Sequence, residues 1–131
     1  MFLTALEGFD YKPYVREGEL SRGEVVTEGT LLWRVPGEEP ITVPAGFVTD
    51  LASLPWFTNG LFKKLGRHQR AAVLHDWLYR EKSGGKVWSD KQFNLAMKHD
   101  GVSRWRRVVF MAGLTAFGWT AWYNAKPVVI V

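Results

Sequence analysis

Two short segments of the chain bring together the side-chain types that a water-activating hydrolase needs. The first is His75-Asp76-Trp77-Leu78-Tyr79, and the second is Ser89-Asp90-Lys91-Gln92-Phe93. On a helix, His75 and Tyr79 lie one turn apart on the same face, while Asp76 is rotated by about 100° from His75. A neutral imidazole can take a proton from water near pH 7, and a carboxylate from another helix can orient it. The spacing therefore predicts a catalytic group with His75 as general base, Tyr79 beside it, and Asp90 as the orienting carboxylate.

Two further carboxylates are candidates for binding a cation beside this histidine. Asp76 could bind a hard cation such as Ca²⁺ together with backbone carbonyl oxygens, and the cation would stabilise a developing oxyanion. Asp50 stands where a predicted strand gives way to a loop. We expect it to meet the helix of His75 as a metal ligand or as a catalytic hydrogen-bond acceptor. The residues alone leave the cofactor unknown, and Ca²⁺ is expected only if the protein is a hydrolase.

The same side chains also fit a structural interpretation, in which they form a buried polar network between two helices. His75 lies on an apolar helical stripe, where a single histidine is often a hydrogen-bonded core residue. Asp76 can pair with Arg80 one turn later in a surface contact, and Asp90 can complement a helix N-terminus. Three further polar residues in this half have no partner at ligand spacing and are interpreted as surface residues. They are His68, His99 and Asp100. Both interpretations stay open at this point.

The composition indicates a single globular domain over residues 1–131 that favours anionic partners. A chain of 131 residues is long enough to bury a core. Its net charge of +4 includes basic groups within residues 63–70 and 104–107, which favour phosphates or lipid headgroups. No groove-reading motif accompanies them, so no specific nucleic-acid partner is expected. The chain has no cysteine, which excludes disulfides and thiolate metal sites.

Neither a signal peptide nor a transmembrane helix is expected from the sequence. The first residues lack a basic region and are interrupted by Glu7. The longest uncharged apolar stretch, residues 108–123, is shorter than the ~20 residues of a spanning helix. An aromatic and basic loop over residues 56–64 would suit an anionic membrane surface or a protein interface, since it combines apolar side chains with lysines.

The order of elements predicts an α+β fold. β-branched and aromatic residues over 11–16, 24–35 and 40–43, separated by turn residues, indicate an N-terminal antiparallel β meander over about residues 1–50. We expect this meander to pack on a C-terminal three-helix region over about residues 67–123, after a loop over 44–66. The apolar tail, residues 127–131, has strand character and would either complete the sheet or dock on another subunit.

Helical periodicity and capping residues place the three helices. The first spans residues 67–80, Ser89 is the expected N-cap of the second, and Ser103 is the expected N-cap of the third. The third is apolar on nearly all sides as far as residue 123, which predicts deep burial. The core-facing positions expected in the first helix are Ala71, Leu74, His75 and Leu78. Those expected in the second helix are Phe93, Ala96 and Met97, and Gly101 is expected to end that helix.

The pattern His75-Asp76-x-x-Tyr79 followed by Asp90-x-x-Phe93 resembles the active-site helices of phospholipases of the A-two class. The resemblance covers about 20 residues. It implies that the histidine activates water, that the adjacent Asp76 binds calcium, and that Tyr79 and Asp90 hold the histidine. The Gly-rich calcium loop that precedes the histidine in that family has no counterpart in this chain.

A second resemblance covers most of the chain and rests on four segments. These are Val43-Pro44-Ala45-Gly46-Phe47-Val48-Thr49-Asp50-Leu51-Ala52-Ser53-Leu54-Pro55, Ala71-Ala72-Val73-Leu74-His75-Asp76-Trp77-Leu78-Tyr79, Ser89-Asp90-x-x-Phe93 and Gly101-Val102-Ser103-Arg104-Trp105. Together they are similar to domain-of-unknown-function family 1353. The resemblance implies a bacteriophage or prophage context, often among virion genes, and leaves the activity open.

We therefore expect a bacteriophage virion-associated structural protein, of the tail-tip or baseplate type, that carries a hydrolase-like His/Asp cluster. Its expected partners are other phage virion proteins or further copies of the chain, with an anionic membrane surface as an additional candidate. The expected location is the virion, or the host cytoplasm before assembly. The alternative is a phage metal-dependent hydrolase, phospholipase-like, that acts on the host envelope with His75 as general base.

Overall fold

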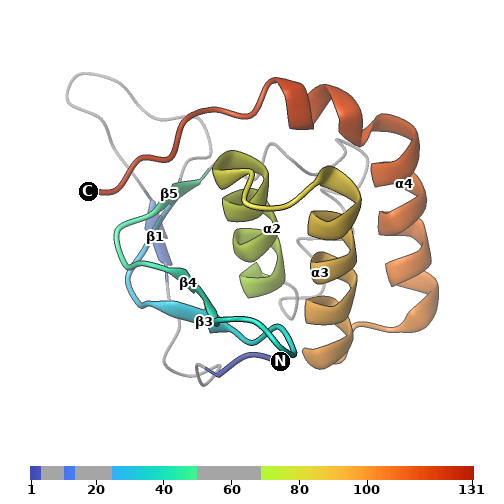
Figure 1. Cartoon of the computed structure of the whole chain (residues 1–131), viewed down its shortest axis with the longest axis horizontal. Helices are drawn as coiled ribbons and strands as arrows, with labels where there is room; N and C mark the ends of the chain where they lie inside the picture. Colours follow the sequence, from blue (N-terminus) through green and yellow to red (C-terminus); the bar gives the residue numbers. More distant parts are fainter. Residues whose placement is uncertain (4–10, 14–24, 50–68) are drawn as a thin grey trace. The chain divides into compact units, whose positions relative to one another are not determined.

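A computed structural model describes residues 1–3, 11–13, 25–49 and 69–131 (Figure 1). The chain divides into two compact units, one formed by Met1–Leu51 with Val128–Val131 and the other by Ala52–Pro127. The first unit holds the described strands and the second holds the described helices, so the fold is α+β as the order of elements predicts. The single domain over residues 1–131 stays a prediction.

The first unit contains two small antiparallel sheets. One has the order β1-β2-β5, and the other pairs β3 with β4. The strands are β1 (Tyr11–Pro13), β2 (Val25–Thr27), β3 (Leu31–Trp33), β4 (Ile41–Val43) and β5 (Val48–Thr49). In the second sheet Leu31 faces Val43 and Trp33 faces Ile41. The side chains of Leu31, Trp33 and Val43 are buried, as period-two alternation requires of one covered face.

The strands differ from the sequence-based prediction in two respects. The segment 24–35 does not form one strand, because a bend at residues 28–30 divides it into β2 and β3, which belong to different sheets. The expected loop over 44–66 contains β5, which pairs with β2 through Val25 and Thr49. Short strands of two or three residues carry too few alternating positions for sequence periodicity to separate them from loops.

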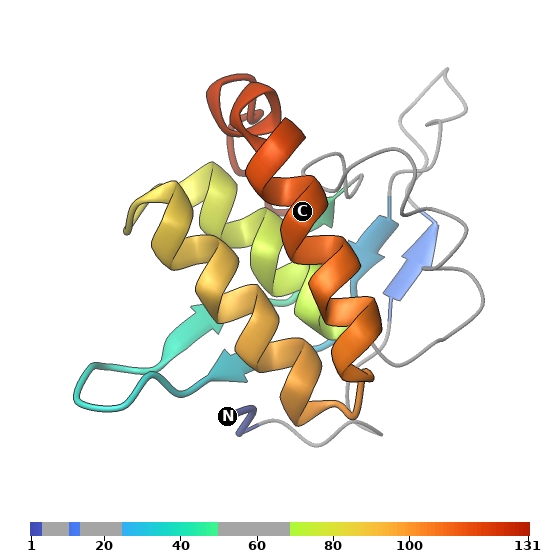
Figure 2. The same ribbon diagram turned by 90° about the vertical axis from the view of Figure 1, so that its right-hand side faces the viewer.

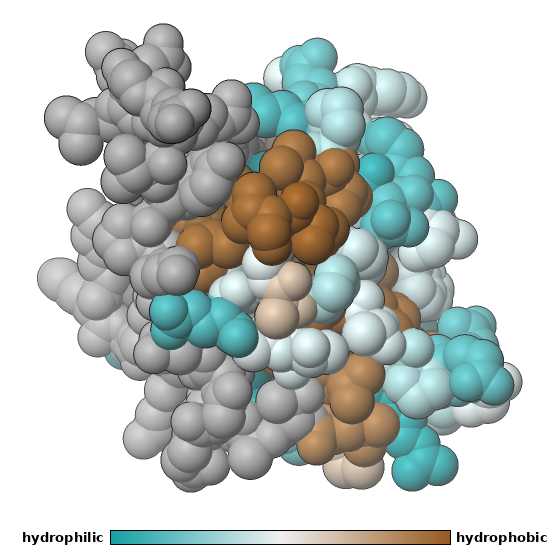
Figure 3. Space-filling view, turned by 90° about the vertical axis from the view of Figure 1, so that its left-hand side faces the viewer, coloured by the Kyte–Doolittle hydropathy of each residue, from teal (hydrophilic) through white to brown (hydrophobic). Residues whose placement is uncertain are grey.

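The C-terminal tail lies along residues 46–48 within the first unit. The amide of Val131 donates to the carbonyl of Gly46 at 2.9 Å, and the amide of Val48 donates to the carbonyl of Val129 at 3.0 Å. Gly46 has φ 87°, and a Cβ there would lie 2.3 Å from the Val131 carbonyl oxygen, so only glycine fits. Of the two roles expected for the tail, extending the strands of its own chain is the one observed. Figure 3 shows hydrophobic side chains gathered on one face of the molecule, and Ile130 and Val131 of the tail are exposed.

The second unit contains three helices, α2 (Gln69–Glu81), α3 (Lys86–His99) and α4 (Arg104–Tyr123). Within this unit α3 packs on both α2 and α4 (Figure 1), and Figure 2 shows the three helices from the side of α4. The predicted apolar faces of α2 and α3 are confirmed, because every one of their core-facing positions is buried. The predicted end of α3 is also confirmed, since the helix stops at His99 and Gly101 adopts φ 85°.

Two predictions about these helices are wrong. Ser89 is not an N-cap, because Gly85 is the N-cap and α3 begins at Lys86, four residues before the predicted start. The Ser89 hydroxyl lies inside the helix and donates to the Gly85 carbonyl at 2.9 Å. The third helix is not deeply buried either. Only Phe110, Gly113, Leu114 and Gly118 of α4 are buried, since a neighbouring helix covers one side of it.

No helix among the described residues has the length and apolar character that crossing a bilayer requires.

Candidate functional site

Two of the helices of the second unit present the predicted site residues to each other. His75 and Tyr79 lie one turn apart on α2, and their rings are in contact, with centroids 4.2 Å apart. Asp90 lies on α3, one turn after Lys86. We call the four side chains His75, Tyr79, Lys86 and Asp90 the Asp90 network. All four are buried, and the network joins α2 to α3.

The carboxylate of Asp90 is the centre of this network. Its Oδ1 atom lies 2.8 Å from Nε2 of His75 and accepts a hydrogen bond of 2.6 Å from the Tyr79 hydroxyl. Its Oδ2 atom accepts a hydrogen bond of 2.7 Å from Nζ of Lys86. Both carboxylate oxygens therefore have donors, and one of these donors is a cation. Such charge-assisted bonds are stronger than neutral ones.

Lys86 extends the network to the third helix. Its Nζ atom also donates to the carbonyl oxygen of Leu114 on α4, at 2.9 Å. Gly118 leaves room for this lysine, because a Cβ at that position would lie 2.9 Å from Cε and 3.0 Å from Nζ of Lys86. The same Cβ would lie 3.2 Å from the Tyr79 hydroxyl. The absence of a side chain at Gly118 is thus part of how the network fits.

The hydrogen bonds fix the protonation states of two members. Burial raises the pKa of the Asp90 carboxyl, but the hydrogen bonds from its three donors outweigh burial, and the net pKa lies below its usual value. Burial, and then the hydrogen bond to Asp90 and its charge, raise the pKa of the Tyr79 phenol. Asp90 is therefore ionised and Tyr79 neutral near pH 7. Since an ionised carboxylate only accepts hydrogen bonds, Nε2 of His75 carries a proton.

Aromatic side chains enclose the histidine. The His75 ring lies between Tyr79 and Phe93, with a centroid distance of 4.6 Å to the latter, and its exposed fraction is 0%. Trp122 of α4 meets Tyr79 edge-on at 5.1 Å. A general base has to reach its proton donor directly or through one water molecule. With Nε2 bonded to Asp90, that function would fall to Nδ1, on a ring with no surface open to solvent.

Of the two predicted metal ligands, Asp76 lies among the described residues and Asp50 does not. Asp76 is buried, and its Oδ2 atom lies 3.0 Å from Nε of Arg80, so the pairing foreseen as a surface contact is a buried one. No group of three or more potential ligand side chains occurs among the described residues. With an arginine in contact, the Asp76 carboxylate does not fit a calcium site in this arrangement. Asp50 and the aromatic loop over 56–64 lie outside the described residues.

Sequence reasoning did not identify Lys86 as a member of the site. The available signal was its spacing of four residues before Asp90, which places the two side chains together on a helix. A helix that is capped by Ser89 does not include Lys86, so this spacing is absent from the predicted helix. Asp100 was also misplaced: it is not a surface residue but accepts a bidentate pair from Arg70, at 2.7 and 2.5 Å, and both side chains are nearly enclosed. This pair also removes Arg70 from the predicted basic surface.

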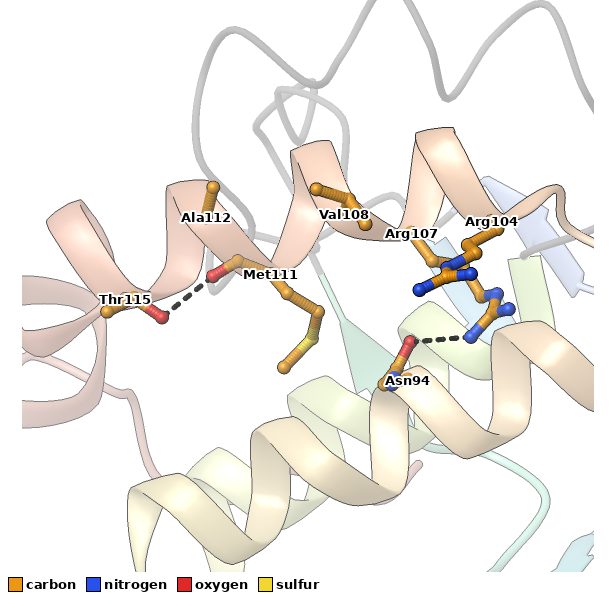
Figure 4. Close-up of a pocket in the computed structure, with 7 residues that line it drawn as sticks. All are labelled: Asn94, Arg104, Arg107, Val108, Met111, Ala112 and Thr115. Atoms are coloured by element: carbon orange, nitrogen blue, oxygen red, sulfur yellow. Dashed lines mark hydrogen bonds between the residues drawn. The ribbon is translucent and has the colours of Figure 1, made fainter.

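A groove of about 500 Å³ lies between α3 and α4, on the outside of the second unit (Figure 4). Arg104 and Arg107 stand at one end, and Val108, Met111 and Ala112 line its middle. The guanidinium of Arg107 donates to Oδ1 of Asn94 across the groove at 3.2 Å. The groove contains none of the residues of the Asp90 network, so the enclosed polar cluster and the open groove are separate features.

The fold and the site define an α+β protein whose polar cluster is enclosed by helices and has all its acceptor oxygens paired. The chain belongs to the family described as protein of unknown function (DUF1353), whose model matches residues 27–114. The matched region contains every side chain of the Asp90 network. Neither a curated protein nor a solved structure matches the chain.

Proposed function

We propose that this protein is a non-catalytic structural component of a bacteriophage particle, of the tail-tip or baseplate type. The observation that carries the non-catalytic part is the state of Asp90, whose two oxygens are engaged by three buried donors. In this proposal the Asp90 network holds three helices together and takes no part in a reaction.

The contacts of Lys86 support this interpretation further. A catalytic histidine needs one oxygen of a carboxylate to orient it, and no cation on the other oxygen. A buried cation at that oxygen weakens the electrostatic stabilisation that the carboxylate gives to the protonated histidine. Here Lys86 takes that oxygen and also binds the Leu114 carbonyl. This arrangement favours fixed helix positions over proton transfer.

The virion part of the proposal rests on family membership and on the surface of the molecule. The phage and prophage context that the family implies makes particle proteins the expected partners. The outer face of α4 carries exposed Trp105, Trp119 and Tyr123, and large aromatic side chains are enriched at protein interfaces, including those between copies of one chain in an assembly. A location in the virion, or in the host cytoplasm before assembly, follows from the same proposal.

The test is whether the protein is part of assembled particles. Particles of a phage that encodes this chain are purified on a density gradient, washed in high salt, and quantified by mass spectrometry against a major capsid protein. We expect a constant copy number per particle from one preparation to the next. Absence of the chain from washed particles that remain infectious would overturn the proposal.

A hydrolase is the second candidate, favoured by one observation. His75, Tyr79 and Asp90, which the phospholipase resemblance implies to act together, do meet through hydrogen bonds of 2.8 and 2.6 Å. The discriminating assay measures fatty acid release from phosphatidylglycerol vesicles in the presence of Ca²⁺, for wild type and for His75→Ala. We expect no release from either. Release by wild type that His75→Ala abolishes, with little loss of thermal stability, would establish the hydrolase instead.

A further inference from the structure

The outer face of α4 carries a continuous apolar stripe. Its members recur at intervals of three and four residues along the helix, so they lie on one side of it. All six are exposed, and none is charged. We call this set the α4 stripe, and its members are Trp105, Val108, Ala112, Ala116, Trp119 and Tyr123.

The stripe faces away from the buried side chains of α4, and two of its members, Val108 and Ala112, also border the groove between α3 and α4. The inner face of α4 is apolar too and is buried through Phe110 and Leu114. A surface helix normally presents polar residues on its outer side, whereas a helix that is apolar all round is covered on both sides. The stripe is about 30 Å long, because α4 has 20 residues. An apolar surface of this extent marks an interaction site.

The distribution of side-chain size along the stripe indicates another helix as its partner. Small residues, Ala112 and Ala116, occupy the middle, and aromatic residues occupy both ends. Two helices that cross at an angle are closest at the crossing point and diverge on either side of it. Small side chains at the centre permit the close approach, and large ones fill the widening space toward the ends. A flat lipid surface would instead be contacted best by large side chains along the whole stripe.

Between Trp105 and Trp119 the positions of the stripe are symmetric about Ala112, which stands midway between these two tryptophans. We propose that the occupant is α4 of a second copy of this chain, running antiparallel, with the two-fold axis at Ala112. Such an isologous contact pairs Trp105 of one copy with Trp119 of the other, and Val108 with Ala116. Two-fold dimers are the commonest homo-oligomers.

Charge favours the antiparallel direction over the parallel one. Arg104, Arg106 and Arg107 stand in the first turn of α4, which has no acidic residue, and arginines there face the positive end of their own helix dipole. A parallel copy would place two such groups side by side. In the antiparallel dimer the two arginine groups lie at opposite ends of the helix pair, which removes this repulsion. The guanidinium of Arg106 already lies 5.0 Å from the Trp105 ring, at the edge of the stripe.

The first experiment measures mass in solution by light scattering after size exclusion. We expect wild type at about twice the chain mass of 15.0 kDa, and Ala112→Arg at half of the wild-type value. Because Ala112 is exposed, the arginine can be accommodated by the folded chain, and an unchanged circular dichroism spectrum checks this. The matched control is Val87→Arg, which adds the same charge at an exposed apolar position of α3 and should leave the dimer intact. A wild type that is monomeric at micromolar concentration would overturn the proposal.

The second experiment uses the absence of cysteine from the chain to fix the geometry. Under mild oxidation we expect Ala112→Cys to give a disulfide-linked dimer, since the two copies of this position meet at the axis. An equimolar mixture of Val108→Cys and Ala116→Cys chains should form the mixed disulfide in excess over either homodimer. Predominance of the two homodimers would show a parallel pair of helices and contradict the antiparallel dimer.

A third measurement separates a protein partner from a lipid surface. Wild type and Ala112→Arg are sedimented with vesicles of phosphatidylglycerol and phosphatidylcholine in equal parts, and with phosphatidylcholine alone. We expect both proteins to stay in the supernatant. Binding of a monomeric wild type to the anionic vesicles, lost on changing Trp105 and Trp119 to alanine, would assign the stripe to a membrane and refute the dimer.

Discussion

Lys86 and Asp90 form an ion pair of 2.7 Å across one turn of α3, and the same lysine Nζ donates to the Leu114 carbonyl of α4. Asp90 in turn accepts from two side chains of α2. One ion pair therefore links all three described helices of the second unit. A buried charge is costly unless it is paired and hydrogen-bonded, and each member of this pair meets that condition only because the other is present.

The first prediction concerns this mutual dependence. Lys86→Met and Asp90→Asn should each lower the free energy of unfolding by about 3–5 kcal/mol, because each leaves its partner buried without a counter-charge. The double variant should lose less than the sum of the two, with a coupling energy of about 0.5–3 kcal/mol. Urea denaturation of wild type, the two single variants and the double variant gives the four free energies of this double-mutant cycle.

The matched control for this cycle is Lys91→Met, the same substitution at an exposed position of the same helix. It should change the free energy of unfolding by no more than about 0.5 kcal/mol. If the two single-variant losses simply add, the ion pair does not have the role described.

The second prediction concerns acid pH. The pKa of Asp90 is lower in the folded than in the unfolded chain, so the unfolded chain binds the proton more readily. The stabilisation is complete when the pH is above the pKa of Asp90 in the unfolded chain, about 3.9. It is lost as the pH falls through the lower pKa of Asp90 in the folded chain. The difference in unfolding free energy between wild type and the Lys86→Met/Asp90→Asn double variant should therefore shrink below about pH 4, the unfolded value. Parallel curves down to acid denaturation would contradict this prediction.

The third prediction concerns alkaline pH and Tyr79. Its pKa is raised in the folded chain, whereas the phenol of the unfolded chain ionises near pH 10, about its ordinary value. The contribution of the neutral Tyr79 phenol to the free energy of unfolding is thus present below that pH and declines above it. At neutral pH, Tyr79→Phe should cost about 1.5–3 kcal/mol, as expected for a hydrogen bond to a charged group. The gap between the two proteins should narrow as the pH rises beyond about 10. A constant gap, measured by urea denaturation at each pH, would refute it.

The sequence predicts the helical core well because its signal is repeated over several turns. The apolar positions of α2 and α3 recur at helical spacing, and each of them is buried. The meeting of His75, Tyr79 and Asp90 follows from the same periodicity, because both buried faces include these residues. Their catalytic role stays a prediction.

Where the sequence misleads, the cause is a local signal outweighed by packing. Ser89 is a favourable N-cap residue, but Gly85 takes that place at φ −75° and ψ 168°, and the helix gains the turn that carries Lys86. The apolar character of α4 indicates burial without indicating which faces neighbouring elements of the same chain cover. The buried pair of Arg70 and Asp100 joins positions 30 residues apart, a distance at which spacing gives no signal.

The last prediction concerns Gly118, the glycine of α4 that faces the Asp90 network. In an exposed helix interior, Gly→Ala adds up to about 1 kcal/mol of stability. Here the added Cβ would lie 2.9 Å from Cε of Lys86, and the lysine cannot move aside without losing its bonds to Asp90 and Leu114. Overpacking costs about 1–3 kcal/mol, so Gly118→Ala should be destabilising. Gly85→Ala is the steric control, because nothing lies within 4 Å of its Cβ position and its one expected cost is the weaker preference of alanine for an N-cap. Thermal denaturation should rank Gly118→Ala below both Gly85→Ala and wild type. A smaller cost of Gly118→Ala in the Lys86→Met background than in wild type would identify the lysine as the obstructing group.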